Sequence, residues 1–306
     1  MNEDELIGRI QRRLPNFAKG GARSSGLILG IGDDAAIYRP AAGEDLVFTT
    51  DMMHEDRHFL RRYPAEAVGW KALCRGLSDI AAMGARPRFA LLSLAVAPWV
   101  KTPWIEAFFD GFLAMAAAHR LPLAGGDLAR AAHTAIDVVV CGSVAAGNAL
   151  RRDTARPGDS IYVSGELGGG ALGLRSPRSK LARARHLRPE PRVALGLALQ
   201  RRRMASAAMD LSDGLSTDLV RLCRASSVSA HLRRPLPAFP GAGEADVLHG
   251  GDDYELLFTV PHGKRVAPRL AGTALHRVGE IGGGEPGCLF LDGEPVAASG
   301  WDHFAK

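Results

Sequence analysis

The sequence is poor in cysteine and contains only Cys74, Cys141, Cys223 and Cys288 among its 306 residues. None of these forms a Cys-x-x-Cys pair, which argues against a disulfide framework or a cysteine zinc site and is typical of reduced thiols in the cytoplasm. The N-terminal stretch MNEDELIGRIQRR lacks the apolar centre of a signal peptide. No charge-free apolar run approaches the roughly 18 residues of a membrane span. We therefore expect a cytoplasmic protein that makes no membrane contact.

Two well-known phosphate-binding motifs are also missing. The chain has no G-x-x-x-x-G-K-[ST] loop and no protein-kinase catalytic-loop signature, so it resembles neither a P-loop protein nor a protein kinase. Positive charge is in slight excess, with 38 Lys and Arg against 33 Asp and Glu, but it is scattered along the chain. Scattered basic residues do not predict a nucleic-acid partner.

Strand-like and helix-like segments alternate in both halves of the chain. Trp70, Leu73, Leu77 and Ile80 form one apolar stripe, which predicts a helix over 65–85. The change in composition near residue 148 predicts two α/β domains, 1–148 and 149–306. Further helices are expected over 3–14, 104–120, 192–208 and 216–226, strands over 45–53, 88–97 and 135–145, and a mobile arginine-rich stretch over 175–190.

Six aspartates stand at or near the ends of these segments. Each one alone fits a turn or a helix cap. As a set they indicate a site, because functional groups gather at loop ends above a rigid scaffold. Carboxylate oxygens without His or Cys suit Mg²⁺ better than zinc, and Mg²⁺ completes its shell with water and substrate phosphates. The pattern therefore predicts a magnesium–phosphate site formed by Asp34, Asp51, Asp79, Asp127, Asp210 and Asp213.

Two other features have more than one interpretation. The glycine-rich segment SGELGGGALGL at 164–174 can present backbone amides to an anion, or it can be a tight turn. Arg152, beside the expected domain junction, can reach a phosphate or can be a solvated linker residue.

Seven motifs occur in the same order as in one known family. They are GIGDDAA, TTDMMHEDRHF, KALCRGLSDIAAMGA, AGGDLAR, DLSDGL, GGDDYELLFTVP and the terminal GWDHF. From about residue 28 to the C-terminus the chain resembles the thiamine-monophosphate kinases, which belong to the aminoimidazole ribonucleotide synthase-like superfamily. Each motif alone is a weak signal, whereas seven in register are a strong one.

This resemblance implies the fold and the reaction. The expected architecture is a two-domain α/β fold with α+β mixed sheets, in which N-terminal strands pair across a homodimer and the C-terminal domain closes the active site. The implied enzyme is a thiamine-phosphate kinase, in which ATP gives its γ-phosphoryl group directly to thiamine monophosphate with the help of several Mg²⁺ ions. We expect no catalytic general base, because a phosphate oxygen is largely ionised at neutral pH.

The resemblance also implies roles for individual residues, and each role has a simpler structural alternative. His58 can be a surface-loop residue, Trp301 a packing anchor, and Thr49 and Thr50 ordinary strand threonines. The family usually reads Gly-Gly-Glu-Asp-Tyr-Glu where this chain has the shorter Asp252. The implied metal ligands are Asp34, Thr49, Thr50, Asp51, Asp79, Asp127, Asp210 and Asp213; the nucleotide contacts are Gly126, Asp127, Arg152 and Ser212; the substrate contacts are His58, Asp252 and Trp301.

Other functions within the superfamily remain as alternatives at this point. One is another ATP-dependent enzyme, such as the ribonucleotide cyclase or the selenophosphate synthetase. The latter uses an N-terminal Cys or selenocysteine, and this chain has no cysteine before Cys74. Another alternative is a non-catalytic metal–nucleotide sensor, which would be expected to lose some of the aspartates that are all present here.

Overall fold

The structure, a computed structural model, describes residues 3–14, 26–31, 35–176 and 178–301. The chain forms two compact units. Unit 1 comprises residues 1–80 and 86–147, and unit 2 comprises residues 81–85 and 148–306. Each unit is a mixed α/β structure, and the expected fold class is confirmed. Within the described ranges, no helix combines the length and the hydrophobicity that crossing a membrane requires.

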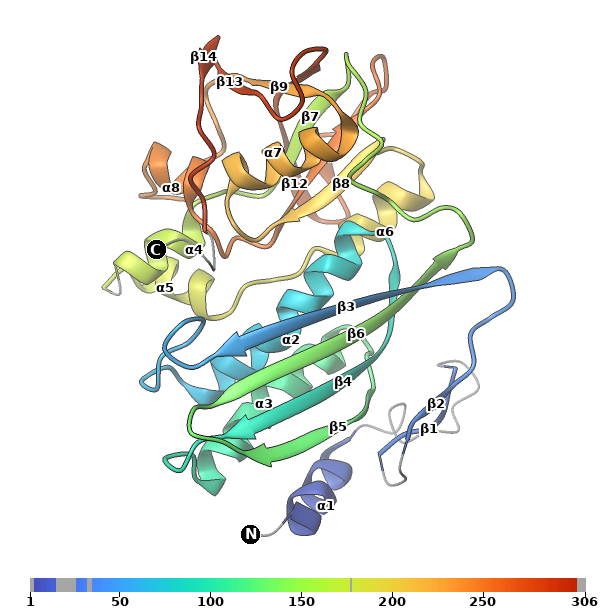
Figure 1. Cartoon of the computed structure of the whole chain (residues 1–306), viewed down its shortest axis with the longest axis vertical. Coiled ribbons are helices and arrows are strands. Elements are labelled where there is room, and N and C mark those ends of the chain that lie inside the picture. The colour runs from blue at the N-terminus through green and yellow to red at the C-terminus, as the bar shows by residue number, and fades with distance from the viewer. Residues whose placement is uncertain (1–2, 15–25, 32–34, 177, 302–306) are drawn as a thin grey trace. The chain divides into compact units, whose positions relative to one another are not determined.

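Unit 1 is built on a four-stranded sheet covered on one face by two helices (Figure 1). The central strands pair in antiparallel fashion, whereas β4 and β5 run parallel. The sheet order is β3 (Glu44–His54), β6 (Ala135–Ala145), β4 (Arg86–Val96) and β5 (Leu123–Arg130), and the helices are α2 (Ala65–Ala82) and α3 (Thr102–Ala118).

The two helices approach each other through glycines. A Cβ atom at Gly111 of α3 would lie 1.8 Å from the carbonyl oxygen of Glu66, and one at Gly69 of α2 would lie 2.0 Å from that of Phe108. Any larger residue at either position would push the helices apart. This close contact fixes α2, which carries the candidate ligand Asp79, against the sheet.

Strand β3 presents different residues to its two sides, because side chains alternate along a strand. Met53 is buried, whereas Phe48 and Met52 on the opposite face remain 60% and 50% exposed. This second side is called the open face here. Near the sheet, unit 1 also contains helix α1 (Glu3–Arg13) and the short strands β1 (Leu27–Leu29) and β2 (Ile37–Tyr38).

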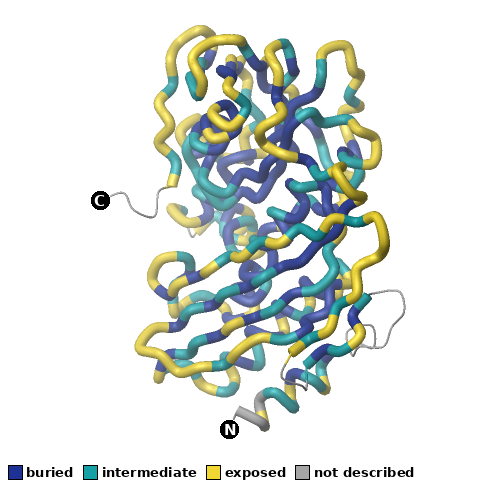
Figure 2. Tube along the Cα trace, turned by 45° about the vertical axis from the view of Figure 1, so that its right-hand side comes forward, coloured by how far each residue is buried: buried dark blue, intermediate teal, exposed yellow. Residues whose placement is uncertain are grey.

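Unit 2 contains a larger mixed sheet, in which β13 and β9 pair in parallel and the other neighbours are antiparallel. Buried residues such as Ile161, Leu219 and Leu257 form its core, and Figure 2 shows the buried stretches following the strands while many loops are exposed. The sheet order is β14 (Glu294–Pro295), β13 (Leu289–Leu291), β9 (Ser229–Leu232), β12 (Thr273–Gly282), β7 (Ser160–Ser164), β10 (Glu255–Val260) and β8 (Ala207–Leu211), with β11 (Arg269–Leu270) beside β12.

Two expectations about unit 2 are wrong. The helix expected over 192–208 ends at Arg201, because residues 207–211 pair with β10. The stretch 175–190 contains an ordered helix, whose Arg185 reaches the buried Glu255. The helices of unit 2 are α4 (Gly169–Arg175), α5 (Lys180–Leu187), α6 (Val193–Arg201), α7 (Leu215–Ser226) and α8 (Glu244–His249).

The Gly111→Ala substitution tests the close contact between α2 and α3. Gly111→Ala should lower the free energy of unfolding by about 1–3 kcal/mol or more, because the added methyl group overlaps a backbone carbonyl. Urea denaturation followed by circular dichroism measures the change. Gly8→Ala in α1 is the control, since a Cβ there meets only the end of Arg12 at 3.5 Å. Equal stability changes in the two variants would contradict the close packing.

Candidate active site

The first group of candidate ligands lies between β3 and α2 in unit 1. The Thr49 hydroxyl donates to the Asp79 carboxylate, and Arg75 Nη2 donates to Asp51 Oδ1 at 2.9 Å. Gly76 of α2 makes this contact possible, since a Cβ atom there would lie 2.7 Å from Val140. The structure therefore brings Thr49, Asp51 and Asp79 together on the helix-covered side of the sheet.

Thr50 belongs to the opposite side. Its hydroxyl donates to Asp137 Oδ1 at 2.7 Å on the open face. Because neighbouring side chains in a strand point to opposite faces, this hydroxyl is separated from Asp51, and the side chain of Thr50 does not join the group. The resemblance to the family gave no means of distinguishing Thr49 from Thr50.

His58 is oriented by a tight turn after β3. The backbone N–H of His54 donates to His58 Nδ1 at 2.9 Å. A neutral imidazole that accepts at Nδ1 carries its proton on Nε2, and the Nε2 atom of His58 is buried in this structure. The turn is anchored by the buried Glu55, which accepts from Thr134 N at 2.8 Å and from Trp99 Nε1 at 3.0 Å.

Glu55 also belongs to a group with metal-ligand atoms within 4.8 Å of one another, together with Asp56 and His133. Burial by itself would raise the pKa of Glu55, but the hydrogen bonds from Thr134 and Trp99 and the ion pair with Arg61 lower it to about 2. Because the Glu55 oxygens are already used by these donors, we interpret this group as an anchor for the turn and not as a metal site.

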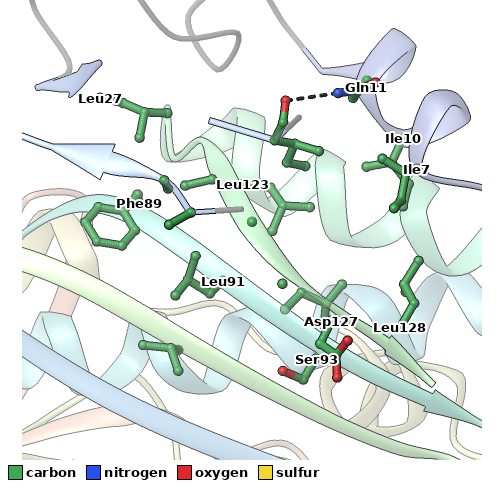
Figure 3. A pocket seen from close by; sticks show the side chains of 18 of the residues that line it. Ile7, Ile10, Gln11, Leu27, Phe89, Leu91, Ser93, Leu123, Asp127 and Leu128 are labelled. Carbon is green, nitrogen blue, oxygen red and sulfur yellow. Dashed lines mark hydrogen bonds between the residues drawn. The ribbon is translucent and has the colours of Figure 1, made fainter. Parts of the chain in front are cut away.

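A cavity of about 1180 Å³ opens on the other side of the unit 1 sheet (Figure 3). Gly126 and Asp127 of β5 line it, and Asp127 lies beside Ser93 of β4, its register partner. Only glycine fits at position 126, where a Cβ atom would lie 1.8 Å from Leu92 O. The remaining wall is mostly apolar and includes Ile7, Ile10, Leu27, Phe89, Leu91 and Leu123.

Helix α1 contributes to this cavity and is tied to α3. Arg9 pairs with Glu106 and Arg13 pairs with Asp110. Gln11 of α1 lines the cavity and donates through Nε2 to Ile31 O at 2.9 Å (Figure 3). The sequence indicated a helix over 3–14, but nothing in its spacing indicated that the helix would line a ligand-sized cavity.

The candidate ligands of unit 1 thus occupy two sides of one sheet. Asp51 contacts α2 on the covered side, whereas Asp127 lies in the cavity on the open face. Strand alternation keeps these two carboxylates apart within the unit. Asp34, the first predicted metal ligand, lies outside the described residues.

Most of the predicted residues of unit 2 gather where β8 ends. Asp252 N donates to Ser212 O at 2.8 Å, and Trp301 N donates to Asp213 O at 3.0 Å. Asp210 lies in β8, two residues before Ser212, and is 8% exposed. The structure therefore places Asp210, Ser212, Asp213, Asp252 and Trp301 around one turn.

Asp218 holds this turn and was not identified from the sequence. Its Oδ2 accepts from Asp213 N at 3.0 Å and from Gly214 N at 3.1 Å, and Arg221 bridges Asp213 and Asp218. Burial, followed by the charge of Asp213, raises the pKa of Asp218 to about 7. Its place in the first turn of α7, just after DLSDGL, is the signal that could have revealed it.

Arg152 lies at the other end of α7. Its carbonyl accepts from Ser226 Oγ at 2.8 Å, whereas Ser212 precedes the first residue of the helix. Twelve helical residues span about 18 Å, so unit 2 does not bring Arg152 close to Ser212.

The glycine-rich segment 164–174 binds a carboxylate of the chain itself. Gly168 N and Gly170 N donate to Asp253 at 2.6 and 3.1 Å. Burial raises the pKa of Asp253 to about 7, although these two hydrogen bonds oppose the shift. Because those amides are occupied, the segment is a structural turn, and of the two interpretations the anion-binding loop is not supported.

The comparisons with known proteins cover both units. The family model "AIR synthase related protein, N-terminal domain" matches residues 32–145, and the corresponding C-terminal domain model matches residues 156–285. The thiamine-monophosphate kinase of Salmonella typhimurium is 38% identical over 304 residues, covering 90% of this chain and 92% of the relative.

Two solved structures are similar over nearly the whole chain. The thiamine-monophosphate kinase from Stenotrophomonas maltophilia is 40% identical, with a TM-score of 0.84, and the match covers 97% of this chain and 98% of that one. AaThiL, complexed with AMPPCP and TMP, is 33% identical, with a TM-score of 0.80 and coverage of 99% and 97%. The chain therefore belongs to the thiamine-monophosphate kinase family, within the AIR synthase related proteins.

Proposed function

We propose that the protein transfers the γ-phosphoryl group of ATP to thiamine monophosphate and forms thiamine diphosphate. Its family relatives are named for this activity, and AaThiL binds AMPPCP and TMP. The observation in this chain that carries the proposal is the cavity of about 1180 Å³, in which Gly126 and Asp127 adjoin an apolar wall. A purine base suits such a wall, and the polar end suits the phosphates.

The cavity has room for a nucleotide and two kinds of surface to bind it. Leu27, Phe89 and Leu123 offer apolar contacts for the base. Gly126 adjoins Asp127 in the wall, and its missing side chain lets β5 pack directly against the Leu92 backbone of β4, which fixes Asp127 beside Ser93. Gln11, which donates to Ile31 O, adds a polar group to the wall.

The residues between β3 and α2 fit Mg²⁺. Asp51, Asp79 and the Thr49 hydroxyl offer oxygen atoms only, which is the ligand set that this ion prefers. Asp127, on the other face of the sheet, is proposed as a ligand of a separate Mg²⁺ ion, and Asp210 and Asp213 in unit 2 are the further ligands that we propose. When bound, Mg²⁺ would neutralise charge on the phosphates of the two reactants. Arg75 already holds Asp51 in a defined orientation.

The acceptor in this reaction needs orientation more than deprotonation. The second pKa of a phosphate monoester is about 6, so the attacking oxygen is largely ionised at neutral pH. We propose that His58 contacts the acceptor phosphate. Its Nδ1 is occupied by His54 N, and its Nε2, which is buried in this structure, would have to become exposed to donate to that phosphate. Asp252 and Trp301, next to Ser212 and Asp213, are the proposed contacts of the thiamine part.

We also propose that the protein is a homodimer formed through the open face of unit 1. Phe48 and Met52 expose large apolar side chains there, which is unfavourable in a monomer. The cavity lies on the same side of the sheet, so a second copy on this face would border the nucleotide. A cytoplasmic location is part of the proposal, and none of the four cysteines, all in the described part of the chain, forms a disulfide.

The direct test is an assay with ATP, Mg²⁺ and thiamine monophosphate, in which thiamine diphosphate and ADP should appear together. Product is measured by chromatography. No product with thiamine monophosphate, combined with turnover of an aminoimidazole ribonucleotide precursor, would assign the chain to the other branch of the superfamily.

Replacing Asp51 tests the metal site. Asp51→Asn should reduce kcat by about 100-fold or more, because it removes a charge that would hold the ion at the transferred phosphate. Circular dichroism should show an unchanged fold. The control is Asp45→Asn on the same strand, where the carboxylate accepts from Gly147 N at 2.8 Å. Near-normal activity of Asp51→Asn would remove Asp51 from the site.

Replacing Phe48 tests the dimer. Phe48→Lys should shift the protein from dimer to monomer, because a charge on the open face would be buried in the interface. Light scattering after size exclusion measures the mass. Leu174→Lys in unit 2 is the control, because Leu174 is 58% exposed, almost as much as Phe48, but belongs to helix α4 and not to the sheet of unit 1. A dimer that persists with Phe48→Lys would exclude this face.

A further inference from the structure

The loop that carries Asp252 has an unusual backbone. Asp252 and Tyr254 both have positive φ angles, 67° and 51°. Residues other than glycine adopt such angles at a cost and keep them where surrounding contacts impose them. Aspartate tolerates this region better than most side chains do. The backbone conformation therefore suits an aspartate at position 252.

Two described side chains contact the Asp252 carboxylate: Tyr254 through a hydrogen bond, and His186 through a longer ionic contact that is not a hydrogen bond. Tyr254 Oη donates to Asp252 Oδ1 at 2.8 Å. His186 Nδ1 lies 3.5 Å from Asp252 Oδ2. The His186 side chain is only 4% exposed, whereas that of Asp252 is 31% exposed. The carboxylate is thus supported from the protein side and accessible from the solvent side.

The position of His186 is determined by close packing of α5 on α4. A Cβ atom at Gly173 of α4 would lie 2.1 Å from Ala182 O and 2.7 Å from the Cβ of His186. The preceding residue, Arg185, donates to Asp253 O at 2.9 Å and pairs with the buried Glu255. Two successive residues of α5 therefore contact the segment 252–255.

We propose that His186 is a positioning residue that holds Asp252 in place for the thiamine part of the substrate. This inference rests on the proposed function and goes beyond it. Thiamine carries a cationic thiazolium ring, and a carboxylate with a fixed orientation attracts a cation more strongly than a mobile one, because less side-chain entropy is lost on binding.

The experiment compares two substitutions at His186 by steady-state kinetics. His186→Leu should raise the KM for thiamine monophosphate about tenfold while kcat and the KM for ATP stay within about twofold, because the lost contact orients only one substrate. His186→Asn should restore the KM, since its amide nitrogen can take the place of Nδ1. Should His186→Leu fail to fold, His186→Phe carries the same expectation.

The control separates this role from general support of α5. Ser179→Ala removes the N-terminal cap of α5, where Ser179 Oγ accepts from Ala182 N, but leaves His186 and Asp252 unchanged. It should leave both KM values near those of the unaltered protein. The inference would be overturned if Ser179→Ala raised the KM for thiamine monophosphate as much as His186→Leu does. It would also be overturned if His186→Leu raised the KM for ATP as much as the KM for thiamine monophosphate, because His186 would then have only a structural role.

A double-mutant cycle measures whether His186 acts through Asp252. In an Asp252→Asn background, His186→Leu should cause little further rise in the KM for thiamine monophosphate, and an undiminished tenfold rise would overturn the inference. An inactive unaltered protein would overturn the proposed function and this role with it. An active protein whose KM is unchanged in His186→Leu would overturn the role of His186 alone.

Discussion

A carboxylate that leaves water must find a positive partner or several N–H donors, and this requirement organises both units. In unit 1, Arg75 of α2 reaches across to Asp51 of β3. In unit 2, Arg185 and Arg192 meet the buried Glu255, and Arg221 bridges Asp213 and Asp218. Each of these ion pairs joins a segment that carries candidate site residues to a helix or to the residue that begins one. The ion pairs that compensate the charge of a carboxylate therefore also hold the site residues in place.

Close backbone contacts complement these ion pairs. Gly76, Gly111 and Gly173 let helices approach a strand or another helix at distances that a Cβ atom would prevent. As a result, residues on different elements, such as Thr49 and Asp79, can meet directly. A site made of short side chains needs this approach, because aspartate and threonine extend only a short way from the backbone.

The acids that looked equivalent in the sequence have different roles in the structure. Asp51 of β3 and Asp79 of α2 lie between these two elements, Asp127 faces a cavity, and Asp253 binds the amides of Gly168 and Gly170. The amides of the glycine-rich turn thus bind a carboxylate of the chain itself and serve its folding. Asp218 belongs to none of the motifs recognised in the sequence, yet it holds the turn next to Asp213.

The amino-acid sequence by itself determined the family, the mixed α/β class and strands such as β3 and β6, because ordered motifs and side-chain periodicity are local properties of a chain. Tertiary structure decided which face each ligand occupies: Thr49 and Thr50 are neighbours in sequence, but only Thr49 meets Asp79. It also decided that residues 207–211 form a strand, because β10 lies beside them, and that His186 reaches Asp252 from 66 positions away in the chain. Such contacts depend on strand register and helix packing, which bring distant residues together and which no local pattern specifies.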